Sequence, residues 1–363
     1  MRSISKIAAV ALMASLTLVG CGNDDKKGSD SSDDTVSCNS GGDGPKVGVA
    51  YDVGGRGDQS FNDSAWAGME KALEELDASC TEAKAAPGEN DTTREERLRT
   101  LADAGYNPVI AIGFIYSPAA AKVAAEFPET DFAVIDGYSQ FLTGDTKLDN
   151  LVDLTFAEEQ GSYLVGVAAG LKTKAKHVGF VGGTHGDLIK KFEAGYVAGV
   201  KSVDPAIKIE VKYLTEDPND GQTGFENPSG GKTAAEGQLD KGADIIYHAA
   251  GKSGLGVFQA VEAAGEGIWA IGVDSDQYLT APEGQKEHIL TSMLKRIDSA
   301  VFLYVQAFVD GAVPSGNVTY DLASDGVGYS TSGGFIDDIK ADIDAAAEKI
   351  KSGEIKVPTA PAS

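Results

Sequence analysis

The sequence predicts an α/β fold in which two lobes, each a doubly wound parallel sheet, are joined by a hinge. From Lys46 onward, short apolar runs alternate with longer amphipathic stretches, which is typical of parallel strands covered by helices on both faces. The alternation restarts near His177, which indicates a second unit of similar size. A chain of 363 residues is also too long for one comfortable hydrophobic core.

The first lobe is expected over residues 46–157. It should begin with a buried strand over 47–52 and a helix over 64–76. The same pattern then predicts, in order, strand 108–113, helix 118–126 and strand 132–136.

The second lobe is expected over residues 158–298 and repeats the pattern of the first. Its predicted elements are, in order, strand 177–183, helix 188–203, strand 207–214, helix 233–241 and strands 244–250, 268–274 and 289–293. The chain is then expected to return to the first lobe, which residues 299–355 should complete. The elements predicted there are helix 298–309, strand 317–322 and helix 336–350.

Residues 1–20 have the pattern of a secretory signal peptide, with a cationic start followed by an apolar run that is too short for a membrane span. The run ends in Leu18-Val19-Gly20-Cys21, which is similar to the lipobox of bacterial lipoproteins. This resemblance implies cleavage before Cys21 and acylation of its thiol, whereas the alternative is a soluble secreted protein. Residues 21–45 are rich in Asp, Ser, Gly and Asn and are predicted to form a flexible tether.

Charge and cysteine content exclude several classes of function. The formal net charge is −24, and losing Arg2 and Lys6 with the leader makes it −26, a charge that repels nucleic acid and anionic headgroups. No second apolar run approaches membrane length, so only the lipid is expected to hold the protein to the bilayer. Cys38 and Cys80 can oxidise outside the cytosol, but a disulfide and two free thiols both remain open. The Cys and His spacing fits no metal site, and no cofactor is expected.

Polar and glycine-rich residues follow most of the predicted strands. Because ligands of open α/β sheets bind beyond the carboxyl ends of the strands, these loops should converge on one crevice. Any one of these glycines alone would be an ordinary turn. The segments are Asp52 with Gly54-Gly55, Gly113-Phe114, Asp136-Gly137, Gly182-Gly183, Ala250-Gly251 and Asp274-Ser275-Asp276.

The sharpest local motif is the glycine-rich loop over 52–62, which delivers Ser60, Phe61 and Asn62 to the start of a helix. It lacks the Gly-Lys-Ser/Thr of a Walker loop and the spacing of a dinucleotide fingerprint. Asp52 and Asp58 would also repel a phosphate. A neutral ligand with hydroxyl groups fits this loop better.

With this motif and those that follow it, the sequence resembles the basic membrane protein family, the nucleoside-binding lipoproteins of ABC transporters. The likeness extends from the lipobox to about Gly334. The segments that carry it are Asp58-Gln-Ser-Phe-Asn62, 65–68, 132–136, 159–166, 179–183, 192–196, 247–251, 272–277 and 291–295. The resemblance implies a fold like that of type I periplasmic binding proteins, a nucleoside ligand and a permease partner.

In that family an aromatic side chain from each lobe stacks on the base, and carboxylates bind the ribose. Matched position by position, Phe61 and Tyr247 are the stacking residues, although a one-residue slip puts His248 in place of Tyr247. Where the family usually has Gly-Gly-Thr-Gly, this chain has Lys252 in the second position, which either alters ligand preference or points to solvent. The remaining ligand-binding residues implied by the resemblance are Asp52, Asn62, Asp136 on the base, Gly251, and Asp274 and Lys295 on the ribose.

Each of these residues also has a structural interpretation. Phe61 can be a core residue at a helix start, Asp136 and Asp274 can cap helices, and Lys295 can neutralise a neighbouring acid. An enzyme such as a nucleoside hydrolase is disfavoured, because the sequence has no Gly-x-Ser-x-Gly elbow and no Cys–His nucleophile pair. A sugar-binding or ligand-sensing lipoprotein of the same fold remains open. We expect a monomeric lipoprotein on the extracytoplasmic face of the cell membrane that delivers a nucleoside, with a purine favoured, to an ABC permease.

Overall fold

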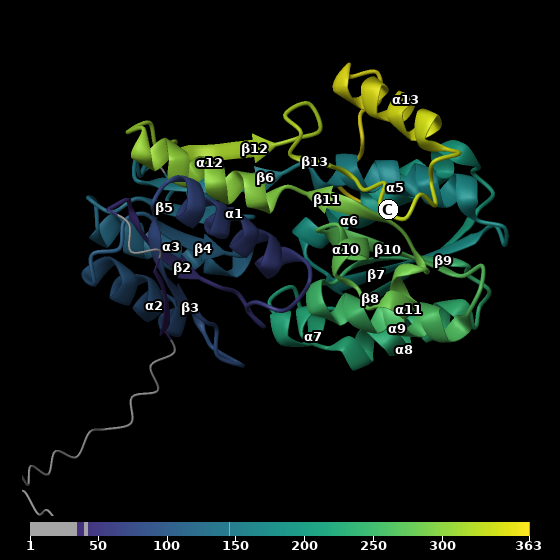
Figure 1. Ribbon diagram of the computed structural model, residues 1–363, viewed down its shortest axis with the longest axis horizontal. Coiled ribbons are helices and arrows are strands. Elements are labelled where there is room, and N and C mark those ends of the chain that lie inside the picture. Colours follow the sequence, from purple (N-terminus) through teal and green to yellow (C-terminus); the bar gives the residue numbers. More distant parts are fainter. Residues whose placement is uncertain (1–34, 40–42, 145, 363) are drawn as a thin grey trace, which may run out of the picture. The chain divides into compact units, whose positions relative to one another are not determined.

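The computed structural model describes residues 35–39, 43–144 and 146–362. It contains two sheets of mainly parallel strands, each flanked by helices, which confirms the predicted α/β class with two lobes (Figure 1). The predicted signal peptide, Cys21 and the first part of the predicted tether lie outside the described residues.

The first sheet is parallel except at one edge, where β1 runs antiparallel to β3. Residues 35–39 were predicted to belong to the flexible tether, and that prediction was wrong for them, because they form the edge strand β1. A disulfide joins Cys38 of β1 to Cys80 of β3 and resolves the open question about these thiols. In spatial order the strands are β1 (Thr35–Asn39), β3 (Ser79–Ala83), β2 (Lys46–Ala50), β4 (Val109–Ile112), β5 (Phe132–Ile135), β6 (Leu151–Phe156) and β12 (Gly316–Tyr320).

Helices cover both faces of the first sheet because its strand residues alternate between two apolar clusters. On one face Val49 and Ile110 pack with α1 and α12, and on the other Ala50 and Val109 pack with α2 and α3. The helices of this lobe are α1 (Phe61–Glu75), α2 (Asp91–Asp103), α3 (Ser117–Glu126), α4 (Ser139–Leu142) and α12 (Ile297–Val309), and a 3₁₀ turn, η1 (Phe114–Tyr116), follows β4.

The second sheet has the same design, with the antiparallel strand β13 at its edge. Parallel sheets buried on both faces carry nearly continuous apolar strands, and β7 and β9 are buried throughout. In spatial order the strands are β13 (Val327–Tyr329), β11 (Ile289–Lys295), β10 (Trp269–Asp274), β9 (Ile245–Ala249), β7 (His177–Thr184) and β8 (Lys208–Thr215).

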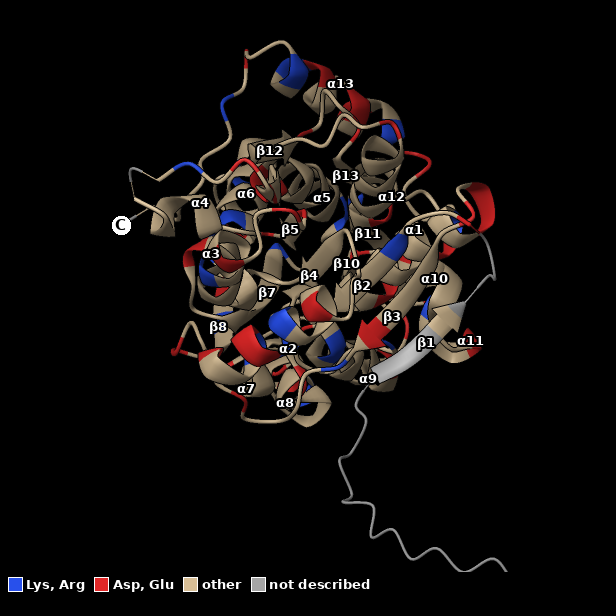
Figure 2. Cartoon of the chain, turned by 90° about the vertical axis from the view of Figure 1, so that its left-hand side faces the viewer, with Lys and Arg blue, Asp and Glu red and all other residues tan. Residues whose placement is uncertain are grey.

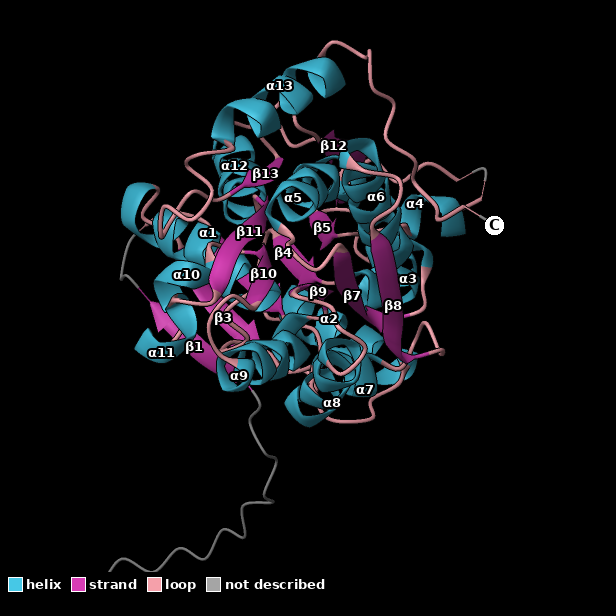
Figure 3. Ribbon diagram, turned by 90° about the vertical axis from the view of Figure 1, so that its right-hand side faces the viewer, coloured by secondary structure: helices cyan, strands magenta, loops and turns pink. Residues whose placement is uncertain are grey.

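In Figure 3, α5 and α6 lie on one side of the second sheet and α8 and α9 lie on the other. The asparagine before α8 helps to start that helix, because the side chain of Asn227 accepts a hydrogen bond from the backbone N–H of Gly230 at 2.9 Å. The helices of this lobe are α5 (Glu158–Lys172), α6 (Asp187–Val203), α7 (Gly221–Phe225), α8 (Pro228–Leu239), α9 (Gly254–Ala264), α10 (Gln277–Thr280), α11 (Glu283–Lys286) and α13 (Lys340–Lys351), with the 3₁₀ turn η2 (Gly251–Ser253) after β9.

The chain passes between the sheets through short connections, at Ala157, at Arg296 and through residues 321–326. Short crossings of this kind are where two lobes can pivot. The last helix was predicted to complete the first lobe, and this prediction was wrong. After β13 has joined the second sheet, α13 packs against α5, and Lys172 of α5 lies 2.5 Å from Asp338 just before α13.

Basic and acidic residues are interspersed over the described residues in the view of Figure 2. Many of them form ion pairs within one lobe, such as Arg99 with Glu95 and Glu126. Within the described part of the chain, no helix is both long and apolar enough to cross a membrane.

Candidate ligand-binding site

A cavity lies between the lobes, at the carboxyl ends of the strands of both sheets. Its position agrees with the crevice that the strand-end loops predict. The first lobe contributes Asp52, Val53, Asp58, Phe61, Asn62, Gly113, Phe114 and Asp136 to the walls, and the second contributes Leu188, Ile189, Phe192, Phe225, Glu226, Ala249, Ala250, Gly251, Lys252, Val273, Asp274 and Lys295.

Most of the residues that sequence reasoning selected are brought together in this cavity. Asp52, Phe61, Asn62, Asp136, Gly251, Asp274 and Lys295 all line it. Lys252, for which two interpretations were open, also lies in the wall and is about one third exposed. The cavity thus gathers several carboxylates around a lysine, and aromatic rings come from both lobes.

Tyr247 is the exception, because it lies inside the core of the second lobe rather than in the cavity wall. Its ring is fully buried against Tyr196, 5.1 Å away, and its hydroxyl lies 3.1 Å from that of Ser162. His248 does not replace it, since this side chain is buried on the opposite face of the sheet against Phe258. Side chains within a strand point to the two faces of the sheet, so only Ala249 at the end of β9 and the residues after it reach the crevice.

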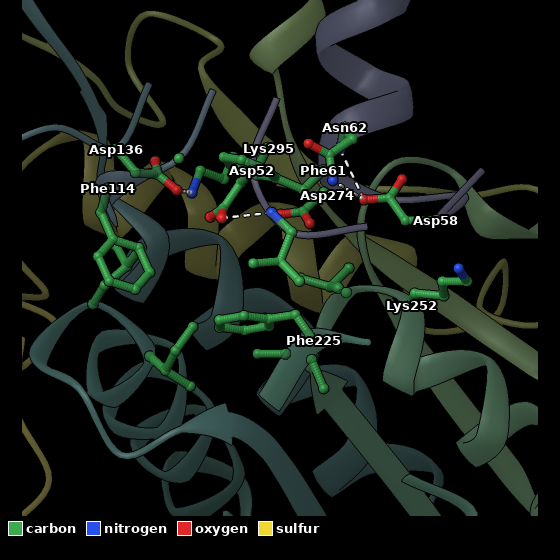
Figure 4. Close-up of a pocket in the computed structure, with 18 of the residues that line it drawn as sticks. Asp52, Asp58, Phe61, Asn62, Phe114, Asp136, Phe225, Lys252, Asp274 and Lys295 are labelled. Carbon is green, nitrogen blue, oxygen red and sulfur yellow. Dashed lines mark hydrogen bonds and ion pairs between the residues drawn. The ribbon is translucent and has the colours of Figure 1, made fainter. Parts of the chain in front are cut away.

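Phe225 is the aromatic residue of the second lobe that sequence reasoning missed. It closes α7, lines the cavity and lies across it from Asp52 and Lys295 in Figure 4. Its ring fits because the neighbouring strand has a glycine there. A Cβ atom at Gly183 would lie 2.3 Å from a ring carbon of Phe225. Phe114 and Phe192 add two further rings to the walls.

The loop before α1 is held by its own carboxylates, and this positions Phe61 and Asn62. Asp58 accepts hydrogen bonds from the backbone N–H groups of Ser60 at 3.0 Å, Asn62 at 2.8 Å and Asp63 at 3.1 Å. Asp58 therefore satisfies N–H groups at the helix start that have no partner within the helix. Its oxygens are engaged within the loop, so Asp58 acts chiefly as a structural residue.

Lys295 lies at the centre of a buried ion-pair network that connects the lobes. Its ammonium nitrogen lies 2.5 Å from Asp136 of the first lobe and 3.1 Å from Glu158 at the start of α5, and Glu158 also pairs with Lys191 at 3.1 Å. Burial lowers the pKa of Lys295, but the carboxylates of Asp136, Glu158 and Asp274 outweigh burial, so its pKa is raised and it stays charged. Its nitrogen also lies 5.3 Å from the ring centre of Phe61.

Asp274 connects the lobes on another side of the cavity. The hydroxyl of Ser60 donates a hydrogen bond to one oxygen of Asp274 at 2.6 Å, and Ser275 donates to the backbone carbonyl of Ser60 at 3.0 Å. Burial raises the pKa of Asp274 to about 7, although Lys295 opposes this shift. Burial likewise raises the pKa of Asp52 to about 7. Both groups can therefore change charge near neutral pH.

Two lobes with a shared cavity at the strand ends define a solute-binding protein of the type I periplasmic class. Residues 45–360 match the family described as Bmp, ABC transporter substrate-binding protein PnrA-like, and the chain belongs to that family. It is therefore a substrate-binding protein, with a small-molecule ligand and a transporter partner on the extracytoplasmic side, and its family is not one of enzymes.

Similar proteins cover nearly the whole chain. It is 34% identical over 379 residues to a CD4+ T-cell-stimulating antigen of Listeria innocua, with 99% of both chains covered. It is 30% identical over 378 residues to the ABC transporter nucleoside-binding protein BmpA of Lactococcus lactis subsp. cremoris, again with 99% of both covered. Among solved structures, an ABC transporter solute-binding protein of Aeropyrum pernix K1 superposes with a TM-score of 0.74 at 28% identity, covering 87% of this chain and 93% of that one.

Proposed function

We propose that this protein captures a nucleoside in the cavity between its lobes, with a purine favoured, and delivers it to the permease of an ABC transporter. The observation that carries the proposal is the presence of Phe61 and Phe225, from opposite lobes, in one cavity that also holds Asp52 and Asp274. The naming of the Lactococcus lactis relative as nucleoside-binding agrees with it.

The chemistry of a nucleoside matches these groups. Its base has two apolar faces, and stacking on an aromatic ring contributes about 1–3 kcal/mol per base. Its ribose hydroxyls can donate hydrogen bonds to carboxylates, which contribute about 1.5–3 kcal/mol each. Asp274 has one oxygen engaged by Ser60, which leaves the other for a ligand hydroxyl. Binding in the submicromolar range requires more than roughly 8 kcal/mol, which these contacts supply only in a closed cavity.

The proposal predicts that affinity depends on pH and on Asp274. Because a hydroxyl donates to an ionised carboxylate, and Asp52 and Asp274 have pKa values of about 7, nucleoside affinity should rise with pH. Between pH 5 and pH 8 we expect a rise of about tenfold to a hundredfold, which should be smaller in Asp274→Asn. Titration calorimetry with guanosine, adenosine, uridine and free ribose measures this.

The same titrations separate a nucleoside receptor from a sugar receptor. Guanosine or adenosine should bind at least as tightly as uridine and far more tightly than ribose, because ribose gains nothing from the aromatic rings. If free ribose bound tightly and no nucleoside bound better, the protein would be a sugar-binding protein on the same fold. Mass spectrometry of ligand released from the denatured protein gives an independent identification.

We also propose that the protein is a monomer anchored through an acylated Cys21. The lipobox supports the lipid anchor. Residues 21–34 of the sequence lie between the anchor and β1. Replacing Cys21 with Ser should move the protein from the membrane fraction to the soluble fraction while its guanosine affinity stays unchanged, because the cavity residues lie far along the chain. A variant that stayed in the membrane fraction would contradict the lipid anchor.

A further inference from the structure

The two lobes also meet at the loop that follows β2, beside the cavity. Gly54, in the exposed loop after β2, has a φ of +88°, and a Cβ atom built on it would lie only 1.7 Å from a carboxylate oxygen of Glu226. The same loop contacts the other end of α7, since a methyl carbon of Val53 lies 3.4 Å from the Cβ position of Gly221. The loop of the first lobe thus approaches the start of α7 and the residue that follows its end.

Glu226 is held in place by its own lobe. The ammonium group of Lys252 donates a hydrogen bond to the second oxygen of Glu226 at 3.1 Å, and both side chains are partly buried. The next residue is fixed as well, because the backbone N–H of Asn227 donates to the hydroxyl of Ser253 at 2.8 Å. Glu226 and Lys252 therefore belong to the second lobe, and the carboxylate of Glu226 meets the first lobe at Gly54.

We propose that Glu226, held by Lys252, is a latch that closes against Gly54 and slows ligand release. The proposal rests on ligand binding in this cavity, but not on the identity of the ligand. When the lobes are together, the carboxylate fills the gap beside the glycine, so a bound ligand leaves only after the lobes separate. Glycine suits position 54, because a Cβ atom there would displace the Glu226 carboxylate and because the φ of this residue is +88°.

The latch predicts a change in dissociation rate rather than association rate. In Glu226→Ala, the dissociation rate of guanosine should rise about tenfold while the association rate changes by less than about threefold, because the contact forms after the ligand has entered. Lys252→Ala should show a smaller rise of the same kind. Glu236→Ala removes a carboxylate from the exposed face of α8, half exposed and outside the cavity wall, and should leave both rates unchanged. Stopped-flow fluorescence measures both rates, and an unchanged dissociation rate in Glu226→Ala would overturn the latch.

A double substitution tests the contact with Gly54 itself. Gly54→Ala should raise the dissociation rate, because the new methyl group meets Glu226 and because alanine is strained at a positive φ. Adding Glu226→Ala removes the clash between the methyl group and the carboxylate, whereas the backbone strain at position 54 remains. The double variant should therefore release guanosine more slowly than the product of the two single effects predicts. Fully multiplicative effects would show that the two residues do not meet, and would overturn the proposal.

The latch can be tested even if the proposed ligand is wrong. Wild-type protein that binds none of the nucleosides would remove the proposed function, but the ligand-free lobes can still be followed by spin-label distances. Lys147→Cys in the first lobe and Lys241→Cys in the second are well exposed label sites. With Glu226→Ala, the distance distribution measured by electron–electron double resonance should shift toward longer distances. An unshifted distribution, together with no effect on ligand release, would contradict the latch.

Discussion

Replacing Lys295 with Met is expected to lower the free energy of unfolding by about 3–5 kcal/mol, because breaking a buried ion pair leaves uncompensated charge. Lys295 is about 1% exposed, and Asp136, Glu158 and Asp274 all face it. Urea unfolding followed by circular dichroism measures the change. Lys191→Met is the matched control, since Lys191 pairs with the same Glu158 but is about one third exposed, and its loss should be smaller.

The pH dependence of this loss identifies its cause. Burial already raises the pKa values of Asp136 and Asp274, and without the ammonium these pKa values rise further above those of the unfolded chain. A carboxyl group whose pKa is higher in the folded protein than in the unfolded chain favours folding while it is protonated. This contribution to stability is lost as the pH rises from the pKa of the unfolded chain through the pKa of the folded protein. The loss in the free energy of unfolding caused by Lys295→Met should therefore grow between pH 5 and pH 8. If the loss in the free energy of unfolding stayed constant over this range, it would result from lost packing instead of unpaired charge.

Tyr247→Ala is expected to lower the stability of the protein, whereas Phe225→Ala is expected to weaken ligand binding. Tyr247 is fully buried among aromatic rings, so its removal should lower the free energy of unfolding by about 3–5 kcal/mol. Phe225 lies in the cavity wall, so its removal should weaken guanosine binding by about 1–3 kcal/mol with little loss of stability. Phe61→Ala should resemble Phe225→Ala. Thermal unfolding and titration calorimetry on the three variants decide between the roles.

The result for Tyr247→Ala separates a core residue from a ligand-binding residue more clearly than the result for Phe225→Ala. A folded Tyr247→Ala protein with weakened guanosine binding and near-normal stability would place this ring on the ligand after all. Tyr247→Phe serves as the control, because it keeps the buried ring and removes only the hydroxyl that meets Ser162. It should cost about 1–3 kcal/mol of stability at most, since it leaves one buried hydroxyl without a partner.

The apolar strands and amphipathic helices could be predicted from the sequence because their patterns follow directly from burial. Strands β2, β4, β5, β7, β9, β10 and β11 and helices α1, α3, α6 and α12 lie close to their predicted ranges. Three apolar, largely buried elements, β6, α5 and α9, received no predicted range, and polar elements were missed as well. β3 has the sequence Ser-Cys-Thr-Glu-Ala, and its Glu82 is buried because Arg56 pairs with it at 3.1 Å. Such pairing depends on residues far apart in the chain, which local periodicity does not reveal.

The site was predictable to the extent that it is built from strand ends. Asp52, Asp136 and Asp274 lie at or just after the ends of strands, and parallel strands bring their carboxyl ends to one edge. Phe225 instead ends the short helix α7, and Glu226 follows it directly, in a segment of the chain with few apolar residues. Nothing in their local pattern indicates a cavity, and only the packing of α7 against Gly183 and η2 places them there.

The pairing of β12 with β6 has a consequence for synthesis. The register places Tyr320 opposite Phe156, so the two strands are separated by most of the second lobe in the sequence. A chain made from its amino end exposes the backbone groups of β6 on one side until β12 has left the ribosome. The first sheet waits for a partner made more than a hundred residues after β6, and β13, which completes the second sheet, follows soon after β12. The lobe that begins the chain is therefore among the last parts to be completed, and this long-range pairing slows its folding.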